Sequence, residues 1–531
     1  MSENIMLINP PVGLDRRIVQ PLGIASIAGV LRAAGYSNVS IIDGCYLSNE
    51  YGYRNSMQVI EGEIERKRPF IVGCTFNNSN SVEIERICKS AFRSGSNVIL
   101  GGHAATATHQ EIAKHFHFMA SHYNSSSSVT IVRGEGEETA KEVADALFQG
   151  KSPLGIRGTT FYDRNRVVVN PDRELMDLNA VEPPAIDLLP PPTGYAGWFN
   201  IEESRGCVFQ CSFCSIRSMY PVFRLKDTER IKVEVKRAKE LGAEKIYLTG
   251  ELLLLHSDRA LAISDIMKSY DIKWSTSAHP TLINKAEDIL PTLKRNGLIC
   301  VEIGIEAASQ RSLDVFNKGS TPKKNREILR VLEKNGIPAW QHLIPFHPYM
   351  NMRDLYENMM FISRNLSNFL TRGDYPRSLT HAWIPAEGTP LFERAIRDKL
   401  VMGRRGKKHV IYKDNRVSEA KKSYDNYFVR AYGGRYARLH SEVIKAIDEA
   451  SSEDMSQNQK FMLIETLPIS ALYVSYSCAL AGVPAQKHVD SLVESFFQTM
   501  YSGNFNISHS EILNSILEDV DEERNTNHRH A

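Results

Sequence analysis

The first third of the chain alternates short apolar runs with longer stretches in which apolar residues recur every three or four positions. The apolar runs lie at Ile5–Asn9, Val39–Asp43, Phe70–Thr75, Asn97–Leu100 and Val129–Val132, and the helical patterns at 22–34, 55–66, 81–94, 107–117 and 136–148. Strands and helices that alternate at this spacing predict a parallel sheet covered by helices on both faces. We therefore expect a doubly wound, Rossmann-like α/β domain over residues 1–150.

A second series of strand and helix patterns begins near Trp198. Its predicted strands are Phe199–Glu203, Lys245–Thr249, Lys273–Ser277, Ile299–Ile305, Ala339–Ile344 and Ser378–Ile384, with helical patterns between them at 226–241, 257–269, 285–296, 322–335 and 352–366. Six such units are typical of a partial, open (β/α)6 barrel, in which chemistry gathers at the carboxyl ends of the strands. The sequence predicts this barrel over residues 196–400.

The segment between the two α/β regions, residues 151–195, is predicted to be a linker. It contains a hairpin-like stretch at Gly158–Val169 and two proline clusters, Pro183-Pro184 and Pro190-Pro191-Pro192. Prolines at this density cannot continue a helix or a central strand.

The strand signal disappears after residue 400, and we predict a mostly helical region over 401–531 with a frayed tail from Glu518. Its most apolar stretch, Leu467–Pro484, contains Pro468, three serines and two tyrosines. That composition favours a buried core helix over a membrane span.

Composition and charge exclude several classes of protein. The 531 residues are 42% hydrophobic and 24% charged, and 64 Lys and Arg against 62 Asp and Glu leave a net charge of +2. These values are typical of a soluble globular protein. A net charge near zero creates no overall electrostatic attraction for a polyanion, so we expect neither a nucleic-acid nor a membrane partner. The start of the chain lacks the pattern of a signal peptide, which predicts a cytoplasmic location. The basic stretch 394–422 is by default a solvated face; the alternative is contact with a phosphorylated substrate or an electron donor.

Three of the eight cysteines form a cluster with Cys-x3-Cys-x2-Cys spacing, namely Cys207, Cys211 and Cys214. Three thiolates from one loop can ligate three irons of a [4Fe–4S] cluster and leave the fourth iron open. Structural zinc is the competing interpretation, but it needs four ligands, and no second Cys or His pair of that spacing follows. The positive charges of Arg205 and Arg217 would stabilise the cysteines as thiolates. The polar residues in this loop argue against three cysteines buried in a core.

The sequence around these cysteines resembles the signature of radical S-adenosylmethionine (SAM) enzymes. It reads Ser204-Arg-Gly-Cys-Val-Phe-Gln-Cys-Ser-Phe-Cys-Ser215, with the aromatic Phe213 before the third cysteine. Downstream, Thr249-Gly250-Glu251 resembles the Gly-Gly-Glu motif of the family, with Thr in place of the first Gly. Gly304–Gln310 with Asn317-Lys318-Gly319, and Ile384–Leu391, resemble the fourth strand segment and the last strand with its exit.

Further motifs upstream resemble the cobalamin-binding domain that precedes the barrel in a methyltransferase-type subclass of these enzymes. They are Asn9-Pro10-Pro11, Pro21-Leu22-Gly23, Gly35-Tyr36, Asp43, Gly101-Gly102-His103 and Arg133-Gly-Glu-Gly-Glu137. A dinucleotide site is disfavoured, because no Gly-x-Gly-x-x-Gly follows the first strand. The resemblance covers residues 5–400. It departs from the subclass at Ile344–Met350, where a Gly-x-Pro-Gly-x-Thr-like turn is usual. The chain also has no Asp-x-His-x-x-Gly motif, so bound cobalamin would lack the lower histidine ligand seen in other cobalamin proteins, as the resemblance to this subclass implies.

The resemblance implies three cofactors: a [4Fe–4S] cluster on Cys207, Cys211 and Cys214, SAM on the open iron, and cobalamin. The SAM-binding candidates are Phe213, Thr249, Gly250, Glu251, Ser275, Ser277 and Glu306. Glu251 would accept a charge-assisted hydrogen bond from the methionine ammonium, the serines would face the carboxylate or ribose, and Glu306 would hold ribose hydroxyls or a substrate amine. The alternative is an ordinary loop carboxylate for Glu251, ordinary strand polar residues for the two serines, and a structural ion-pair partner for Glu306.

The cobalamin-binding candidates lie at the predicted strand ends, where ligands bind in open α/β sheets. They are Pro10, Pro11, Thr75, Phe76, Asn77, Gly101, Gly102, His103, Gly134, Glu135 and Gly136. His103 is more typical of a turn residue than of a ligand. Substrate contacts are expected from His342, His347 and Trp383, with a core position as the alternative for each.

The implied reaction is methylation of an unactivated carbon, or of phosphorus, in a small-molecule biosynthetic intermediate, by way of a 5′-deoxyadenosyl radical. The partners would be that substrate and an electron donor such as flavodoxin or ferredoxin. One alternative is non-methylating radical chemistry on the same scaffold, such as ring rearrangement, cyclisation or oxidation. The other is a metal-stabilised binding protein without catalysis. A tRNA-thiolating enzyme is disfavoured, because Cys45, Cys74 and Cys88 are scattered and form no further cysteine set.

Overall fold

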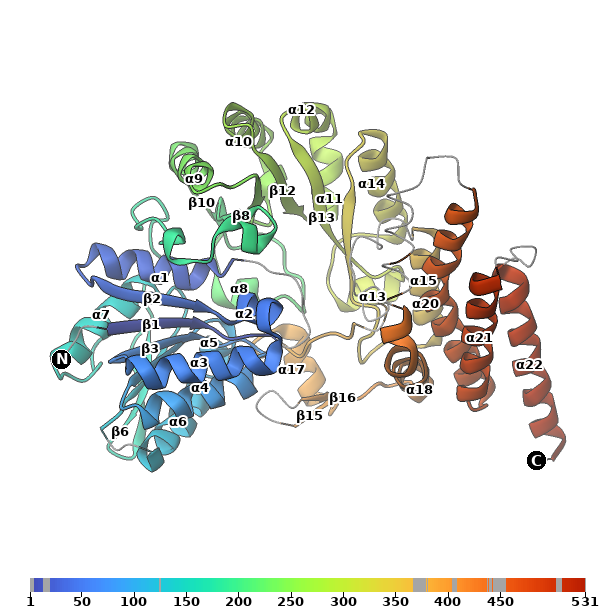
Figure 1. Cartoon of the computed structure of the whole chain (residues 1–531), viewed down its shortest axis with the longest axis horizontal. Coiled ribbons are helices and arrows are strands. Elements are labelled where there is room, and N and C mark those ends of the chain that lie inside the picture. The colour runs from blue at the N-terminus through green and yellow to red at the C-terminus, as the bar shows by residue number, and fades with distance from the viewer. Residues whose placement is uncertain are drawn as a thin grey trace.

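The computed structural model describes residues 4–12, 20–123, 126–365, 379, 381–403, 408–436, 438, 442, 455–502 and 509–530. Three parts follow one another along the chain (Figure 1): an N-terminal sheet with its helices in blue to cyan, a second sheet with helices in green to yellow, and a group of helices in orange to red.

The N-terminal part is a seven-stranded sheet with the order β2-β1-β3-β4-β5-β6-β7. Its parallel strands are β1 (Asn4–Asn9), β2 (Asn38–Asp43), β3 (Ile71–Thr75), β4 (Asn97–Gly101) and β5 (Val129–Val132), followed by the antiparallel β6 (Thr159–Asp163) and β7 (Arg166–Val169). The doubly wound prediction is confirmed. The hairpin expected inside the linker pairs with β5, so the first sheet continues beyond residue 150.

Helices cover both faces of this sheet because its strands are apolar on both sides. The helices are α1 (Leu22–Ala33), α2 (Gly44–Tyr51), α3 (Tyr53–Lys67), α4 (Ser81–Arg93), α5 (His103–Ala107), α6 (His109–Tyr123) and α7 (Glu137–Phe148). Successive residues of β1 alternate between the faces: Met6 packs with α3, α4 and α6, whereas Leu7 packs with α1 and α7. All five central strands end at the same edge.

The second sheet has five parallel strands in the order β14-β13-β12-β11-β8. They are β8 (Trp198–Ile201), β11 (Lys245–Leu248), β12 (Lys273–Ala278), β13 (Leu298–Glu306) and β14 (Ala339–Leu343). The predicted sixth strand is reduced, in the described residues, to one parallel bridge between Phe346 and Ala382; Ser378 and Thr380 lie outside the described residues. The arrangement is an open partial barrel.

Helices, turns and one short ladder connect the strands of this sheet. They are α8 (Ile216–Met219), α9 (Thr228–Glu240), α10 (Ser257–Ser269), α11 (Pro280–Ile283), α12 (Leu290–Arg295), α13 (Gln310–Val315), α14 (Pro322–Lys334) and α15 (Met352–Arg364), with 3-10 turns at Ile186–Leu188, Pro192–Tyr195, Leu253–Leu255 and Asn284–Ile289, and a two-stranded ladder of β9 (Ser204–Arg205) and β10 (Arg224–Leu225).

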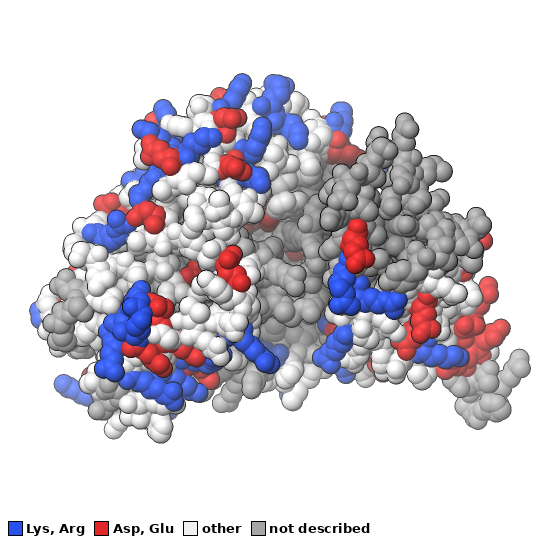
Figure 2. All heavy atoms as spheres, viewed as in Figure 1, with Lys and Arg blue, Asp and Glu red and all other residues white. Residues whose placement is uncertain are grey.

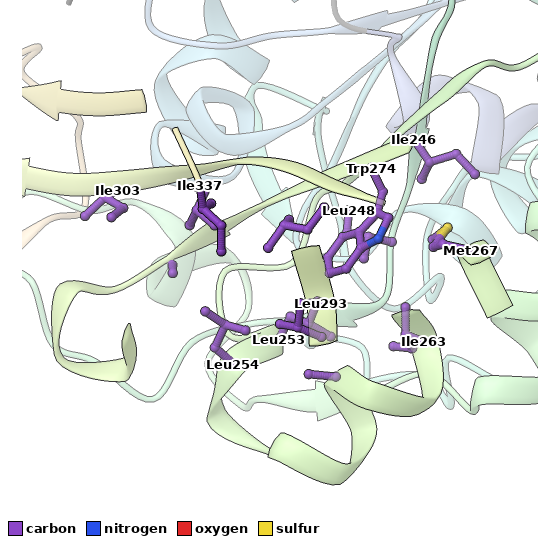
Figure 3. Packing of buried hydrophobic residues seen from close by; sticks show 14 of the residues in the cluster. Ile246, Leu248, Leu253, Leu254, Ile263, Met267, Trp274, Leu293, Ile303 and Ile337 are labelled. Carbon is purple, nitrogen blue, oxygen red and sulfur yellow. The ribbon is translucent and has the colours of Figure 1, made fainter. Parts of the chain in front are cut away.

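The core of the barrel lies on one side of the sheet only. Figure 3 shows Ile246, Leu248 and Trp274 directed toward the helical residues Ile263 and Met267, and all of them are buried. Residues that alternate with these along the strands face the other way, and there the side chains are largely polar. This polar inner face is where the candidate site lies.

The C-terminal part is mostly helical. It comprises α17 (Pro390–Arg397), α18 (Asn415–Tyr424), a π-helical turn (Asp425–Arg430), α20 (Met455–Ala481), α21 (Gln486–Ser502) and α22 (His509–His530), with a short ladder of β15 (Val401–Met402) and β16 (His409–Val410). The expectation that strands end at residue 400 was wrong for this ladder. The stretch from Leu467 is confirmed as a buried core helix, with Pro468 inside it. Across the described ranges, the chain has no helix that combines the length and the apolar character needed to cross a membrane.

Candidate active site

The cysteine loop lies at the carboxyl end of the barrel sheet, where backbone hydrogen bonds hold it against the end of α13. The Ser212 amide donates to the carbonyl of Phe316 at 2.8 Å, and its hydroxyl donates to the carbonyl of Val315 at 2.7 Å. The Asn317 side chain donates to the carbonyl of Gln210 at 2.7 Å. The loop is therefore attached to residues that lie more than 100 positions further along the chain.

All three cysteine thiols are half-buried and free. Burial raises the pKa of each thiol, that of Cys214 to about 12, and the charge of Lys318 opposes this for Cys207 and Cys211. Iron would displace these protons, because a ligating thiol is deprotonated. Within the part of the chain that the structure describes, no three His, Cys, Asp or Glu side chains converge on a single metal ion. A cluster does not require such convergence, since each thiolate ligates a different iron.

Glu306 and Lys318 form a buried ion pair beside this loop. The Lys318 Nζ lies 3.1 Å from the Glu306 Oε1, and both side chains are less than a tenth exposed. Glu306 adopts a positive φ of 63° next to an irregularity in the β13–β14 register. Gly304 leaves the room for this pair, because a Cβ there would overlap the Glu306 carboxylate and lie 2.7 Å from Lys318 Nζ. Strained backbone of this kind concentrates at functional sites.

The Thr249-Gly250-Glu251 segment follows β11 at the same edge. A Cβ on Gly250 would overlap the carboxylate of Glu203, a fully buried residue two positions after β8, so a glycine is required for this close approach. Burial raises the pKa of the Glu251 carboxyl, and the charges of Lys318 and His342 oppose that effect. Glu251 thus lies within electrostatic reach of the cysteines and of the barrel interior.

A chain of hydrogen bonds crosses the polar inner face of the barrel sheet. The hydroxyls of Ser277 and Tyr247 are 2.6 Å apart, Tyr247 donates to Glu302 at 3.3 Å, and the His342 Nε2 lies 2.8 Å from the same carboxylate. The buried Ser275 hydroxyl has no hydrogen-bond partner among the described residues. The sequence prediction included both serines and His342 but missed Tyr247 and Glu302. The alternation of polar residues along the predicted strands could have identified Tyr247 and Glu302.

A cavity of about 400 Å³ opens between the N-terminal domain and the base of the cysteine loop. Its apolar part lies between one face of the first sheet and helices α1 and α7, and is lined by residues such as Leu7, Ile24 and Ile99. Arg205, Met219 and Tyr220, which flank the cysteine loop, line its other side. The glycines at the strand ends keep this edge open, which suits a large cofactor approached by backbone.

Eight of the eleven cobalamin-binding candidates line this cavity, namely Thr75, Asn77, Gly101, Gly102, His103, Gly134, Glu135 and Gly136. Pro10 and Pro11 lie outside it, and Phe76 is buried in the sheet core. His103 lies 3.4 Å from the Asn78 amide and 3.3 Å from the Ser218 hydroxyl, and burial lowers its pKa. Both of its ring nitrogens therefore have protein neighbours, one in each α/β domain.

Two of the three substrate candidates lie in the protein core. His347 is completely buried, lies 2.9 Å from the Ser312 hydroxyl, and has its pKa lowered by burial to about 3. Trp383 is 3% exposed and packs with Tyr349, and it also borders a cavity of about 440 Å³ next to α18. We assign a packing role to His347 in place of substrate contact. His342, with its side chain 34% exposed, stays a predicted substrate residue.

Comparison with known proteins agrees with this architecture. The B12 binding domain family matches residues 15–144, and the radical SAM superfamily matches residues 201–362; together they match more than half of the chain. An uncharacterized methyltransferase of Pyrococcus horikoshii is 28% identical over 416 residues, which are 75% of this chain and 84% of that protein. The anaerobic magnesium-protoporphyrin IX monomethyl ester cyclase of Rubrivivax gelatinosus is also 28% identical, over 340 residues, 60% of this chain and 57% of the cyclase.

Among solved structures, the cobalamin-dependent SAM radical enzyme OxsB with aqua-cobalamin and SAM bound superposes with a TM-score of 0.70. The superposition covers 98% of this chain and 84% of that one at 16% identity, so it establishes the fold alone. The cofactors of the two matched families are a [4Fe–4S] cluster with SAM, and cobalamin. The chain therefore belongs to the radical SAM superfamily, among the enzymes that carry an N-terminal B12-binding domain.

Proposed function

We propose that this enzyme methylates an unactivated carbon, or phosphorus, of a small-molecule biosynthetic intermediate. The observation that carries the proposal is the shared wall of the two cofactor sites. Arg205, Met219 and Tyr220, which flank the cysteine loop, line the same cavity as the glycine-rich edge of the cobalamin-binding domain. The base of the cysteine loop would therefore lie next to a bound methyl donor, and such positioning is what the protein contributes to cofactor chemistry.

When bound, the cofactors would supply a methyl group and a carbon-centred radical that removes hydrogen from the substrate. The tasks of the protein follow from the side chains described above. Cys207, Cys211 and Cys214 would ligate three irons, and Glu251 would accept from the methionine ammonium of SAM. Glu306, held by Lys318 at the loop, and the unpartnered Ser275 hydroxyl offer further polar contacts. The apolar cavity would exclude water from reactive groups.

The proposal is tested without knowledge of the substrate. The enzyme is reconstituted anaerobically with iron, sulfide and hydroxocobalamin, then incubated with SAM and a reductant. We expect 5′-deoxyadenosine together with S-adenosylhomocysteine in an amount close to the bound cobalamin. A variant with all three loop cysteines changed to alanine should lose the brown colour and both products, whereas Cys45→Ala should retain them. 5′-Deoxyadenosine without S-adenosylhomocysteine in the cobalamin-loaded enzyme would overturn methylation.

A second candidate function is radical cyclisation or oxidation without methyl transfer. The match to the cyclase is as high in identity as the match to the methyltransferase, which favours keeping this candidate. The same assay separates the two. A cyclising enzyme would consume one SAM per 5′-deoxyadenosine and release no S-adenosylhomocysteine at any cobalamin loading.

Radical SAM chemistry requires a reductant and, in this enzyme, a small-molecule substrate. We propose flavodoxin or ferredoxin as the physiological electron donor, which should replace dithionite in supporting 5′-deoxyadenosine formation. We also propose a cytoplasmic location, because all eight cysteines are free thiols and the cytosol keeps thiols reduced.

A further inference from the structure

A buried ion cluster connects the cobalamin-binding domain to the base of the cysteine loop. Arg205 lies 3.2 Å from Glu135, 2.9 Å from Glu137 and 2.8 Å from Glu202, and Arg224 is paired with Glu135. We call these five residues the inter-domain ion cluster. Glu135 and Glu137 belong to the N-terminal domain, whereas the other three belong to the barrel.

The carboxylates of the cluster stand at the wall of the cobalamin cavity. Glu135 and Glu137 flank Gly136 where α7 begins, and all three residues line the cavity. Glu135 was predicted from sequence to bind cobalamin, but its carboxylate is engaged by Arg224 and by the backbone amide of Met176 at 3.0 Å. This segment therefore holds the neighbouring domain while it forms part of the cavity.

The arginines of the cluster stand at the base of the cysteine loop. Arg205 is separated from Cys207 only by Gly206, and Arg205 pairs with Arg224 in the β9–β10 ladder that closes the loop. Gly206 has a positive φ of 88°, and a Cβ there would overlap the Val222 carbonyl, so the loop leaves the ladder along one tightly constrained path. A shift of Arg205 would consequently be transmitted to the first cysteine.

The burial of the cluster makes its geometry demanding. The side chains of Arg205, Glu135 and Glu137 are each 7% exposed or less. Removing one member of a buried charge pair leaves the other poorly compensated. The Arg205 guanidinium uses two nitrogens on Glu202 and also lies 5.3 Å from the Tyr220 ring, a further cavity residue. The contacts of Arg205 thus define one relative placement of loop and cavity.

We propose that the inter-domain ion cluster positions the cysteine loop against the cobalamin cavity, so that cobalamin and SAM each strengthen the binding of the other. Arg205 and Glu137 are then positioning residues that act through the loop and touch neither substrate nor reacting atoms. A ligand that orders the cavity wall also orders the loop, and such coupling is reciprocal by linkage. The inference goes beyond the proposed function, because it requires only the two cofactors and holds for either reaction.

The test measures binding alone. The dissociation constant of SAM is determined by equilibrium dialysis on cluster-reconstituted enzyme, with and without saturating hydroxocobalamin. In the unmodified enzyme we expect SAM to bind at least about fivefold more tightly when cobalamin is present, and cobalamin to show the same factor when SAM is present. In Glu137→Gln, which keeps the shape of the side chain, we expect the factor to fall below about twofold while iron content stays near four per chain.

Two further variants complete the design. Arg205→Lys keeps the charge but cannot reproduce the forked contacts, so it should lose the coupling as well, and it replaces Glu137→Gln should that variant fail to fold. Arg237→Gln is the matched control: it breaks a half-exposed pair with Asp187 at 2.6 Å, between α9 and the segment before the barrel, and should retain the coupling. Equal SAM affinity with and without cobalamin in the unmodified enzyme, or full coupling in Glu137→Gln or Arg205→Lys, would overturn the inference.

Discussion

Replacing Lys318 by methionine tests whether the buried pair with Glu306 organises the SAM side of the barrel. The substitution keeps most of the side-chain volume and removes the charge that lies 3.1 Å from Glu306. With its side chain only 9% exposed, Glu306 is left as an unpaired carboxylate in a poorly solvated place.

The expected cost follows from two independent magnitudes. Breaking a buried ion pair on one side costs about 3–5 kcal/mol. The carboxyl can escape that penalty by taking up a proton, and protonating an ordinary glutamate at pH 7 costs about 3.7 kcal/mol. The second value is a ceiling on the electrostatic part, so we expect Lys318→Met to lower the free energy of unfolding by about 3–4 kcal/mol.

The assay is urea unfolding of the apo-chain at pH 7, followed by tryptophan fluorescence, since Trp274 lies in the barrel core. The double variant Glu306→Gln with Lys318→Met should recover at least half of the loss, because both charges are then gone. Lys323→Met is the control: its partner Glu327 is 3.9 Å away, both side chains are largely exposed, and we expect a change below about 0.5 kcal/mol. The reasoning is refuted if Lys318→Met is as stable as this control, or if the double variant is no more stable than the single one.

Three other predictions concern the Thr249-Gly250-Glu251 segment, the cavity predicted to bind cobalamin, and the effect of pH. Gly250→Ala should weaken SAM binding at least about tenfold in equilibrium dialysis, because the added methyl group overlaps the buried Glu203 carboxylate. As a control, the methyl group of Gly62→Ala in α3 meets no other atom, and this variant should stabilise the chain by about 0.5–1 kcal/mol in thermal unfolding. Gly73→Leu should push the Leu7 side chain, which a Cβ at Gly73 would meet at 2.6 Å, into the cavity that both residues line. It should thereby reduce hydroxocobalamin binding at least about tenfold, with iron content after reconstitution unchanged. Burial lowers the pKa of His279 and of His347 to about 3; the stability contributed by these neutral rings is complete above pH 6.5 and is lost as pH falls toward 3, by up to roughly 1.4 kcal/mol per pH unit for each ring. Urea midpoints at pH 7, 6 and 5 should therefore fall less steeply in His347→Gln than in the unmodified chain, and equal slopes would contradict this.

The elements that the sequence predicted well are those whose signal is local. The period-two and period-3.6 patterns placed β1 to β5 and the barrel strands within a few residues, since alternation along a strand reports which positions are buried. The predicted linker was less accurate, because β6 and β7 have the pattern of an isolated hairpin and only the edge of β5 decides that they extend a sheet. The last barrel strand was overestimated for a similar reason: its bridge to Phe346 depends on a neighbouring chain segment.

The family of the chain could be inferred from sequence alone, and with it the prediction that Cys207, Cys211 and Cys214 bind the cluster. Three cysteines in one short loop are fixed relative to one another by the chain itself, so their spacing favours an iron–sulfur cluster without reference to the rest of the fold. The glycines at the strand ends likewise predict where backbone would approach a ligand, and several of them line the cavity.

Side-chain partners were decided only by the tertiary structure. Arg205 and Glu137 are 68 positions apart in sequence, and His342 and Glu302 are 40 apart, yet each pair is in contact. His347 has the same imidazole as His342, but His347 is buried against Ser312 and Phe316, whereas His342 is 34% exposed and contacts Glu302 on the polar face of the barrel sheet. Local periodicity specifies an element and its buried face, whereas these contacts depend on how separate strands and domains are brought together, for which a single sequence contains no local signal.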